Sequence, residues 1–238
     1  MLDKEDFYKI MDGEGKSDYE IYLNTKKLFS CQKNFDSLCN QDELMFQITH
    51  QVEELWMKTI NHTLLNINDH FQLHNNNLIL TLFKRVHLIQ KMMIEQLSVL
   101  ETMSPKDYQL IRLGLGSGSG IESPGFRATL KIAQLLWHSF QKYYLNNDLT
   151  KIEKIYNSEY QHCDCYIIAE SLIEFDELFQ NFRYKHIKIV ERTIGIDSLS
   201  LKGRSVKLLN HGIKQQFFPQ LWEIRSVMTN KCHTSYGQ

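Results

Sequence analysis

Apolar residues recur at intervals of three and four over long stretches of this chain, which is the spacing of one face of an α-helix. Only three prolines and 11 glycines occur in 238 residues, and strand-like alternation between turn residues is hard to find. The pattern predicts an almost entirely α-helical fold. The expected helices span roughly residues 18–32, 42–67, 77–103, 105–113, 124–146, 150–182, 183–195 and 205–228.

No internal repeat or low-complexity linker divides the chain, and its length suits one domain with a substantial core. We expect a single helical domain over residues 1–238, with residues 1–32 as an N-terminal segment. The conspicuous break is the glycine-rich stretch GLGSGSGIESPG at 114–125. It lacks the Gly-Lys-Ser/Thr ending of a nucleotide-binding loop. Two alternatives remain, a flexible surface connection and a loop that closes over a small molecule.

Charge and composition narrow the function classes. The 27 Lys+Arg nearly cancel the 28 Asp+Glu and are scattered, which argues against binding to nucleic acid. The N-terminus is acidic and polar, and no apolar run reaches membrane-spanning length, so we expect a cytoplasmic protein without a membrane partner. Five cysteines are expected as reduced thiols. The cluster HCDC at 162–165 lacks the second ligand pair that a zinc site needs.

The stretch MFQITHQVEELWMKTINHTLL, residues 45–65, raises the first functional candidate. Phe46 and His50 are four residues apart and share one face of the predicted helix, where an aromatic ring and an imidazole could line a flat pocket. A hydrogen-bonded core histidine is the alternative. A second stripe is predicted to face the core and consists of Leu44, Ile48, Val52 and Leu55.

Two further candidates lie later in the chain. His186 shares a predicted helix face with apolar residues such as Phe182 and Ile189, while basic residues such as Arg183 occupy the other faces. A neutral imidazole on an apolar wall suits the axial ligand of a haem iron, although a core histidine without metal has the same pattern. Arg127 follows the glycine-rich stretch, and its planar fork suits a carboxylate, as in an amino acid.

Four motifs in the same order resemble the tryptophan 2,3-dioxygenase family of haem enzymes. YEIYLNTKKLFSCQ (19–32) is similar to the family's Tyr-x-x-Tyr-Leu…Gln opening, and DELMFQITHQVEELWMKTI (42–60) to its Phe-x-x-x-His-Gln…Glu-Leu-Trp pattern. SGIESPGFR (119–127) resembles Ser-Gly-Phe-Gln-Ser-x-Gln-Phe/Tyr-Arg, and RYKHIKIVERTIG (183–195) resembles the haem-ligand helix. Together they cover about a third of the chain.

The resemblance implies a helical bundle that encloses b-type haem, with His186 as the axial ligand of the iron. It implies that His50 lies beside the indole nitrogen of the substrate, that Phe46 forms a pocket wall, and that Arg127 holds the substrate carboxylate. In the family, an N-terminal segment completes a neighbouring subunit's pocket, which implies a homodimer or homotetramer. The residues concerned here are Tyr19, Tyr22 and Leu23.

The sequence also departs from the family. Where the family has a Gly-Thr-Gly-Gly loop, whose threonine contacts the substrate ammonium group, this chain reads LSLK at 199–202. Ser200 keeps a hydroxyl in the threonine's place, but a loop without those glycines should take another shape. In the third motif, the family's phenylalanine and two glutamines are replaced by Ile121, Glu122 and Gly125. The connection between Arg127 and His186 is also shorter than in typical members.

These features indicate a haem-dependent oxygenase that uses O2 and acts on L-tryptophan or a related aromatic amino acid, with N-formylkynurenine as the product if the pattern is complete. Two alternatives stay open. The first is a haem-dependent monooxygenase, or hydroxylase, of a tryptophan derivative or of tyrosine. The second is a helical protein that binds haem or an aromatic ligand without catalysis.

Overall fold

The structure is a computed structural model of the chain. It describes residues 3–116, 118, 120–157, 163–199, 201, 203, 205–206, 212 and 215–233. Within those ranges the chain forms helices, turns and one isolated bridge between Leu199 and Ser205, with no strand. The predicted all-α fold is confirmed.

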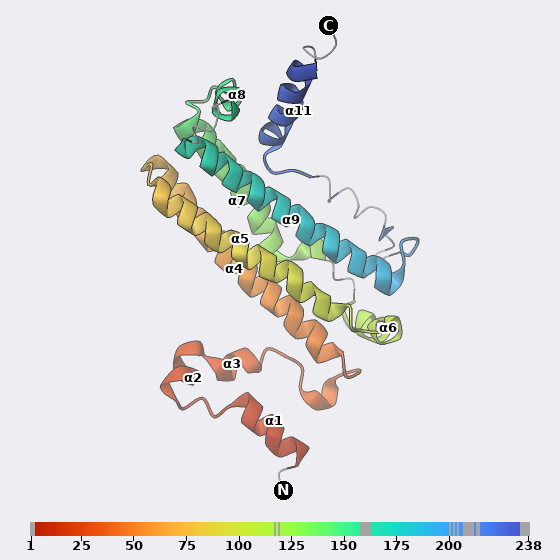
Figure 1. Cartoon of the computed structure of the whole chain (residues 1–238). Coiled ribbons are helices and arrows are strands. Elements are labelled where there is room, and N and C mark those ends of the chain that lie inside the picture. The colour runs from red at the N-terminus through yellow and green to blue at the C-terminus, as the bar shows by residue number, and fades with distance from the viewer. Residues whose placement is uncertain are drawn as a thin grey trace.

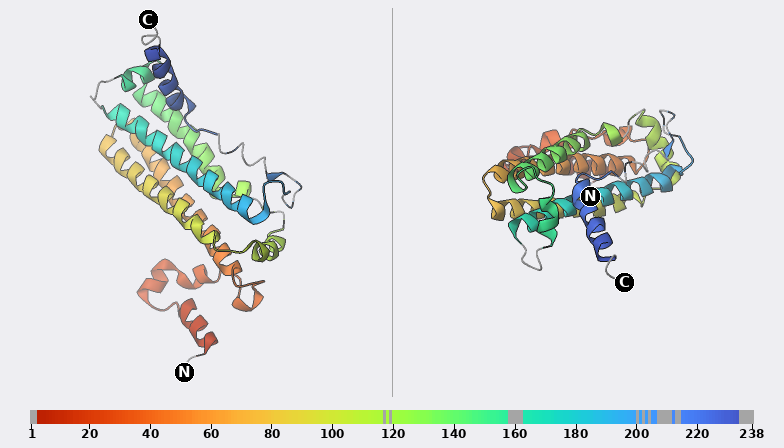
Figure 2. Two further views of the ribbon diagram at one scale, coloured as in Figure 1. Left: turned by 45° about the vertical axis from the view of Figure 1, so that its right-hand side comes forward. Right: turned by 90° about the horizontal axis from the view of Figure 1, so that it is seen from above.

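Four long helices form a bundle (Figure 1): α4 (Glu43–Gln72), α5 (Asn76–Leu100), α7 (Pro124–Tyr144) and α9 (Asp164–Ile194). α4 packs against both α5 and α7, and α5 also packs against α9. α4 and α7 run in one direction and α5 and α9 in the other, so the start of α4 lies at the same end as the end of α9 (Figures 1 and 2).

The core follows the interior of this bundle. Each long helix contributes fully buried apolar side chains, among them Leu64, Phe83, Phe140 and Phe175. Burial of one such side chain stabilises the fold by roughly 1.5–3 kcal/mol. A smaller cluster of Leu97, Leu100 and Ile189, with Phe46 and Phe182 beside it, lies where α4 begins and α9 ends.

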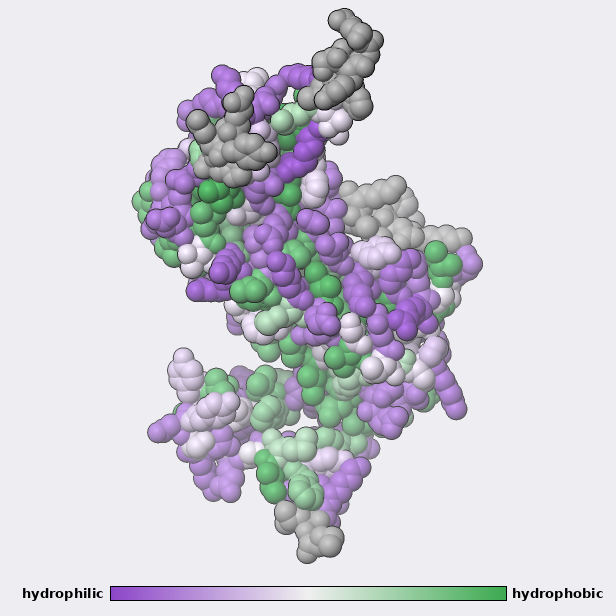
Figure 3. Space-filling view, viewed as in Figure 1, coloured by the Kyte–Doolittle hydropathy of each residue, from purple (hydrophilic) through white to green (hydrophobic). Residues whose placement is uncertain are grey.

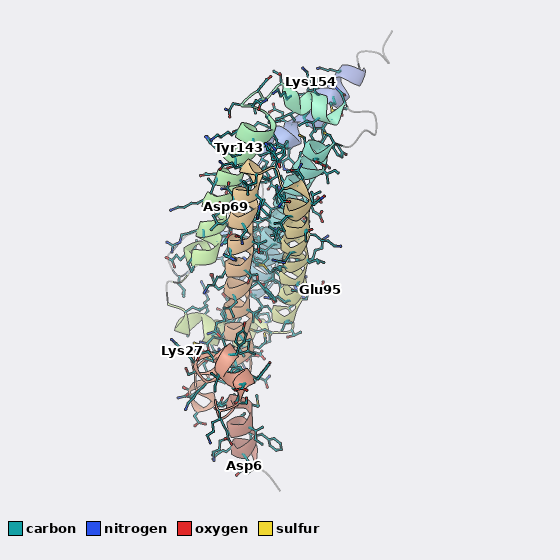
Figure 4. The ribbon with its side chains drawn as sticks, turned by 90° about the vertical axis from the view of Figure 1, so that its left-hand side faces the viewer. Asp6, Lys27, Asp69, Glu95, Tyr143 and Lys154 are labelled. Atoms are coloured by element: carbon teal, nitrogen blue, oxygen red, sulfur yellow. The ribbon has the colours of Figure 1, made fainter. Side chains whose placement is uncertain are left out.

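Shorter elements flank the bundle. α1, α2 and α3 lie at one end, with Asp6 and Lys27 marking them in Figure 4, and α8 and α11 lie at the other, near Lys154. Two hydrogen bonds tie the end of the N-terminal segment to α4: the Gln32 side-chain amide donates to the Gln51 side-chain oxygen, and the Gln51 side-chain amide donates to the Cys31 carbonyl. The bounds are α1 Lys4–Asp12, α2 Asp18–Leu23, α3 Thr25–Phe29, η1 Phe35–Ser37, α6 Pro105–Gly114, η2 Gly120–Glu122, α8 Lys151–Tyr156 and α11 Pro219–His233.

Several predicted helix boundaries are wrong. The helix expected at 18–32 is broken at Asn24, whose backbone is left-handed with φ of 55°, into α2 and α3. The helices expected at 150–182 and 183–195 are instead α8 followed by α9, which continues unbroken through the expected boundary. Of the helix expected at 205–228, the structure describes α11, which begins at Pro219; residues 207–211, 213 and 214 lie outside the described residues. The residues just before α11 are held outside a helix because the buried Asp176 carboxylate accepts the backbone N–H of Phe217 at 2.8 Å and of Phe218 at 3.2 Å.

The stripe predicted to face the core along α4 is also wrong in part. Ile48 is 41% exposed and Leu55 is 50% exposed, while Thr49, Glu53 and Met57 are buried. α4 packs against both α5 and α7. The residues that these two helices bury lie one position further along the sequence than the most apolar stripe. Within the described residues, no helix is long and apolar enough to cross a membrane.

Candidate active site

The first part of the site is on α4. The ring centroids of Phe46 and His50 are 4.2 Å apart, and Nδ1 of His50 lies 2.7 Å from the Phe46 carbonyl oxygen. A carbonyl only accepts, so Nδ1 carries the proton and the lone pair of the neutral ring is on Nε2. Burial lowers the pKa of His50, against the opposing effects of that hydrogen bond and of the Glu54 charge. His50 therefore presents a hydrogen-bond acceptor at neutral pH.

His186, in the last part of α9, is the second histidine of the site. Burial, together with the charge of nearby His50, lowers the pKa of His186 to about 4, so its imidazole is neutral at physiological pH. His50 therefore lies within electrostatic range of His186. η2 approaches His186 closely, because a Cβ on Gly120 would lie 3.7 Å from the Cε1 atom of its ring.

Tyr108, on α6, adds an aromatic wall that the sequence did not point to. Its ring centroid is 5.9 Å from that of Phe46. Burial raises the pKa of Tyr108, so its phenol keeps its proton and remains a hydrogen-bond donor. α6 begins as its sequence predicts, with Ser104 accepting the Asp107 N–H and Pro105 at the first helical position. Aromatic character alone did not distinguish this tyrosine from the other tyrosines of the chain.

Arg127 lies in the first turn of α7 and its side chain is exposed. The helix begins at Ser123, whose hydroxyl accepts the Phe126 N–H at 3.0 Å. The Gly125 N–H donates to Oε2 of Glu54 at 3.0 Å. Glu54 is one helical turn after His50, so this contact brings the turn that carries Arg127 to the part of α4 that carries His50.

The remaining predicted site residues are not gathered there. Tyr19, Tyr22 and Leu23 on α2 are 72%, 89% and 44% exposed, so they are not packed against this chain's own bundle. Ser200 lies outside the described residues. Before it, the Leu199 carbonyl accepts a hydrogen bond from Arg112 at 2.6 Å.

The basic side chains on α9 include one that sequence reasoning misplaced. Arg183 was expected on an outer face, yet it is 7% exposed. Its guanidinium lies over the rings of Phe179 and Phe217 and donates to the Gln215 carbonyl at 2.5 Å. The chain before α11 covers this side of α9, which the sequence of α9 alone does not reveal.

The cysteine cluster lies partly outside the described residues. Cys163 and Cys165 are free thiols at the start of α9, and His162 lies outside the described residues. No group of three or more His, Cys, Asp or Glu side chains in the described part of the chain is placed to hold a metal ion.

Comparison with known proteins gives the family of the chain. The family model described as tryptophan 2,3-dioxygenase matches residues 8–133, more than half of the chain. The chain is 29% identical to a tryptophan 2,3-dioxygenase of Myxococcus xanthus, over 92% of this chain and 92% of that protein. It is 29% identical to one of Rhodococcus jostii, over 91% and 94% respectively, and 27% identical to one of Erythrobacter litoralis, over 88% and 98%.

The helical fold and these relatives define the class: the protein is a haem-dependent oxidoreductase. More narrowly, the chain belongs to the tryptophan 2,3-dioxygenase family.

Proposed function

We propose that the protein is a dioxygenase that inserts O2 into the indole ring of L-tryptophan or a related aromatic amino acid, giving N-formylkynurenine from tryptophan. The observation that carries the proposal is the state of His50. Its Nδ1–H is committed to the Phe46 carbonyl, which leaves Nε2 as an acceptor beside an aromatic wall. An indole N–H is the complementary donor.

The residues present fit a haem group. His186 is uncharged because its pKa is lowered to about 4, and an axial ligand must offer a free lone pair. Gly120 lies beside the ring, where a Cβ would be in ordinary contact with Cε1 at 3.7 Å. We propose that His186 holds the iron of haem b. When bound, the haem supplies the activation of O2, and the protein supplies orientation and exclusion of water.

The other residues act on the substrate. Phe46 and Tyr108 provide flat aromatic surfaces, and His50 accepts the indole N–H. Arg127 binds the carboxylate through two parallel hydrogen bonds, which fixes the amino-acid end of the molecule. With both ends held, the indole C2=C3 bond has one orientation towards the haem face, and this restriction accelerates the reaction by removing unproductive poses.

We further propose that the enzyme is a homodimer or homotetramer. Apolar side chains of the N-terminal segment are exposed in the single chain, and Figure 3 shows them as green surface below the bundle. Leu23 belongs to this set, and the rings of Tyr19 and Tyr22 on the same helix are exposed as well. A second copy would cover them, and they in turn would close its pocket.

One observation favours a second candidate, the monooxygenase or hydroxylase. At 199–202 the sequence lacks the glycines of the family's loop, and Leu199 is instead bridged to Ser205. Gly125 replaces a residue with a long side chain in the third motif. A substrate pocket with these changes suits a modified tryptophan or tyrosine as well as tryptophan.

The deciding experiment incubates the ferrous haem protein with candidate amino acids under isotopically labelled O2 and weighs the products. Two labelled oxygen atoms in an N-formylkynurenine-type product support the dioxygenase, and one labelled atom in a hydroxylated product supports the alternative. A protein that shows no haem absorption even after haem is added would instead be a ligand-binding protein of another kind.

A further inference from the structure

The start of α7 touches α4 more closely than any residue with a side chain would permit. A Cβ built on Gly125 would lie 2.7 Å from the Met57 Cβ and 2.8 Å from the Glu54 Oε2. The Met57 Cβ is fixed to its backbone and cannot rotate away. Any larger residue at position 125 must therefore push α7 away from α4.

The backbone of Gly125 is also held at both of its polar groups. Its N–H donates to Glu54 at 3.0 Å. Its carbonyl accepts from the Asn61 amide at 3.0 Å and from the Thr129 hydroxyl at 2.9 Å. Asn61 and Thr129 are buried, and the Thr129 hydroxyl also lies 2.9 Å from the Asn61 amide oxygen. These hydrogen bonds fix the position of Gly125 along the axis of α4 as well as its distance from that helix.

The contact of Gly125 with Glu54, Met57 and Asn61, called here the Gly125 seat, lies on the same face of α4 as the residues of the site. Glu54, Met57 and Asn61 follow His50 at spacings of four, three and four, so all lie on one face of the helix. Arg127 is only two residues after Gly125. The seat thus joins the two side chains that, in the proposed function, hold opposite ends of the substrate.

We propose that Gly125 and Glu54 form a positioning site that sets the separation between Arg127 and His50, and thereby selects amino acids whose carboxylate and ring nitrogen match that separation. The inference rests on the proposed function. Neither residue contacts the substrate, so their effect is exerted through Arg127. The motif of the family carries glutamine where this chain has Gly125. The Gly125 seat is therefore a feature by which the pocket of this chain differs from the family's pattern.

The test compares dissociation constants of two ligands, tryptophan and tryptamine, which lacks the carboxylate, measured from the change in haem absorption of the intact holoenzyme. Their ratio reports how well Arg127 meets the carboxylate. Gly125→Ala and Glu54→Leu each displace the turn, and we expect each to weaken tryptophan binding roughly tenfold or more while changing tryptamine binding little. A shift of about 1 Å suffices for losses of this size.

Two controls separate positioning from general damage. Glu54→Gln keeps an oxygen acceptor for the Gly125 N–H and should retain most of the ratio. Gly114→Ala, where the nearest atom is an ordinary 3.8 Å away, should leave it unchanged. Haem content and thermal midpoint are measured for every variant, and Glu54→Leu serves if Gly125→Ala does not fold.

A ratio unchanged in both Gly125→Ala and Glu54→Leu overturns the inference while the proposed function stands. Equal weakening of both ligands also overturns it, because that is the result of a merely structural contact. If the wild-type protein binds neither ligand, the proposed function itself fails, and the inference fails with it.

Discussion

His50 is an orienting group in the proposed mechanism, and its hydrogen bond to the Phe46 carbonyl fixes which nitrogen can serve. We expect His50→Ala to reduce turnover by roughly ten- to a hundredfold without abolishing it, the size of a lost orienting contact. Steady-state kinetics measure this directly. His50→Gln offers a different acceptor and should recover part of the loss. Unchanged turnover in His50→Ala would remove His50 from the site.

Arg127 should act on binding, because the carboxylate it holds is remote from the reacting carbons. Arg127→Leu is expected to weaken substrate binding by roughly 2–4 kcal/mol, as it leaves a carboxylate without its charged partner. The Michaelis constant of the best substrate is the measurement, and Arg127→Lys, which keeps the charge but not the fork, should lie in between. An unaltered constant would mean that the substrate is not a free amino acid.

His186 should decide whether haem binds at all. We expect His186→Ala to abolish the ferrous histidine-ligated absorption spectrum. The variant should also unfold at lower denaturant concentration in the presence of haem, because a cofactor that binds only the native state adds to its stability. The same comparison without haem is the control, since there the difference should be small. A retained spectrum would show that another residue is the ligand.

Sequence spacing predicted the adjacency of Phe46 and His50 because both belong to one helix, where a separation of four residues fixes proximity. It could not place residues whose surroundings come from distant elements. The sequence of α9 predicts Arg183 on the surface, yet residues 215–218 cover its side chain. Tyr108 reaches Phe46 only through the packing of α6.

At the scale of elements, regular periodicity predicted α4, α5, α6 and α7 to within a few residues. The residues just before α11 differ from the prediction because they contact another element. Residues before α11 carry helical spacing, but Asp176 on α9 accepts the N–H groups of Phe217 and Phe218, and the Trp222 indole N–H at 2.9 Å. A buried carboxylate with several donors outweighs local helix propensity.

The interface of α4 and α5 carries an unusual acid, Glu53. It is 5% exposed, and burial raises its pKa to about 8 although Gln96 donates to it at 2.6 Å. In the unfolded chain the carboxyl loses its proton near 4.5. The folded state therefore holds a proton that the unfolded state releases, and stability falls as pH rises from about 4.5 to about 8.

Replacing Glu53 with glutamine should remove this loss. The free energy of unfolding of Glu53→Gln, taken relative to that of wild type, should be larger at pH 9 than at pH 5 by roughly 2–4 kcal/mol. Urea unfolding at the two pH values measures it. The exposed Glu95 on α5, labelled in Figure 4, provides the matched control Glu95→Gln, for which we expect no pH-dependent difference. If Glu53→Gln changes the free energy of unfolding equally at both pH values, the Glu53 carboxylate is charged in the folded protein and the prediction is wrong.

At the scale of the whole molecule, two groups of exposed apolar residues suit the proposed contact with a second copy of the chain. One group is on the N-terminal segment, where Phe7 is 52% and Ile21 is 63% exposed. The other is the outer stripe of α4, with Ile48 and Leu55. Single exposed apolar residues are ordinary, but rows of them on consecutive elements are typical of an interface.

If the N-terminal segment completes a neighbour's pocket, its removal should separate substrate binding from haem binding. Deleting residues 1–25 should lower the oligomeric state and weaken substrate affinity more than haem content, since His186 lies on α9 in the bundle. Tyr19→Ser combined with Tyr22→Ser tests the same contact without truncation, because both rings are exposed in the single chain. Leu135→Ser is the control, a 42% exposed apolar residue on α7 outside that segment. Light scattering gives the oligomeric state and haem absorption gives both affinities. A monomer with full activity would contradict the shared pocket, because a site completed by a second subunit loses affinity when that subunit is absent.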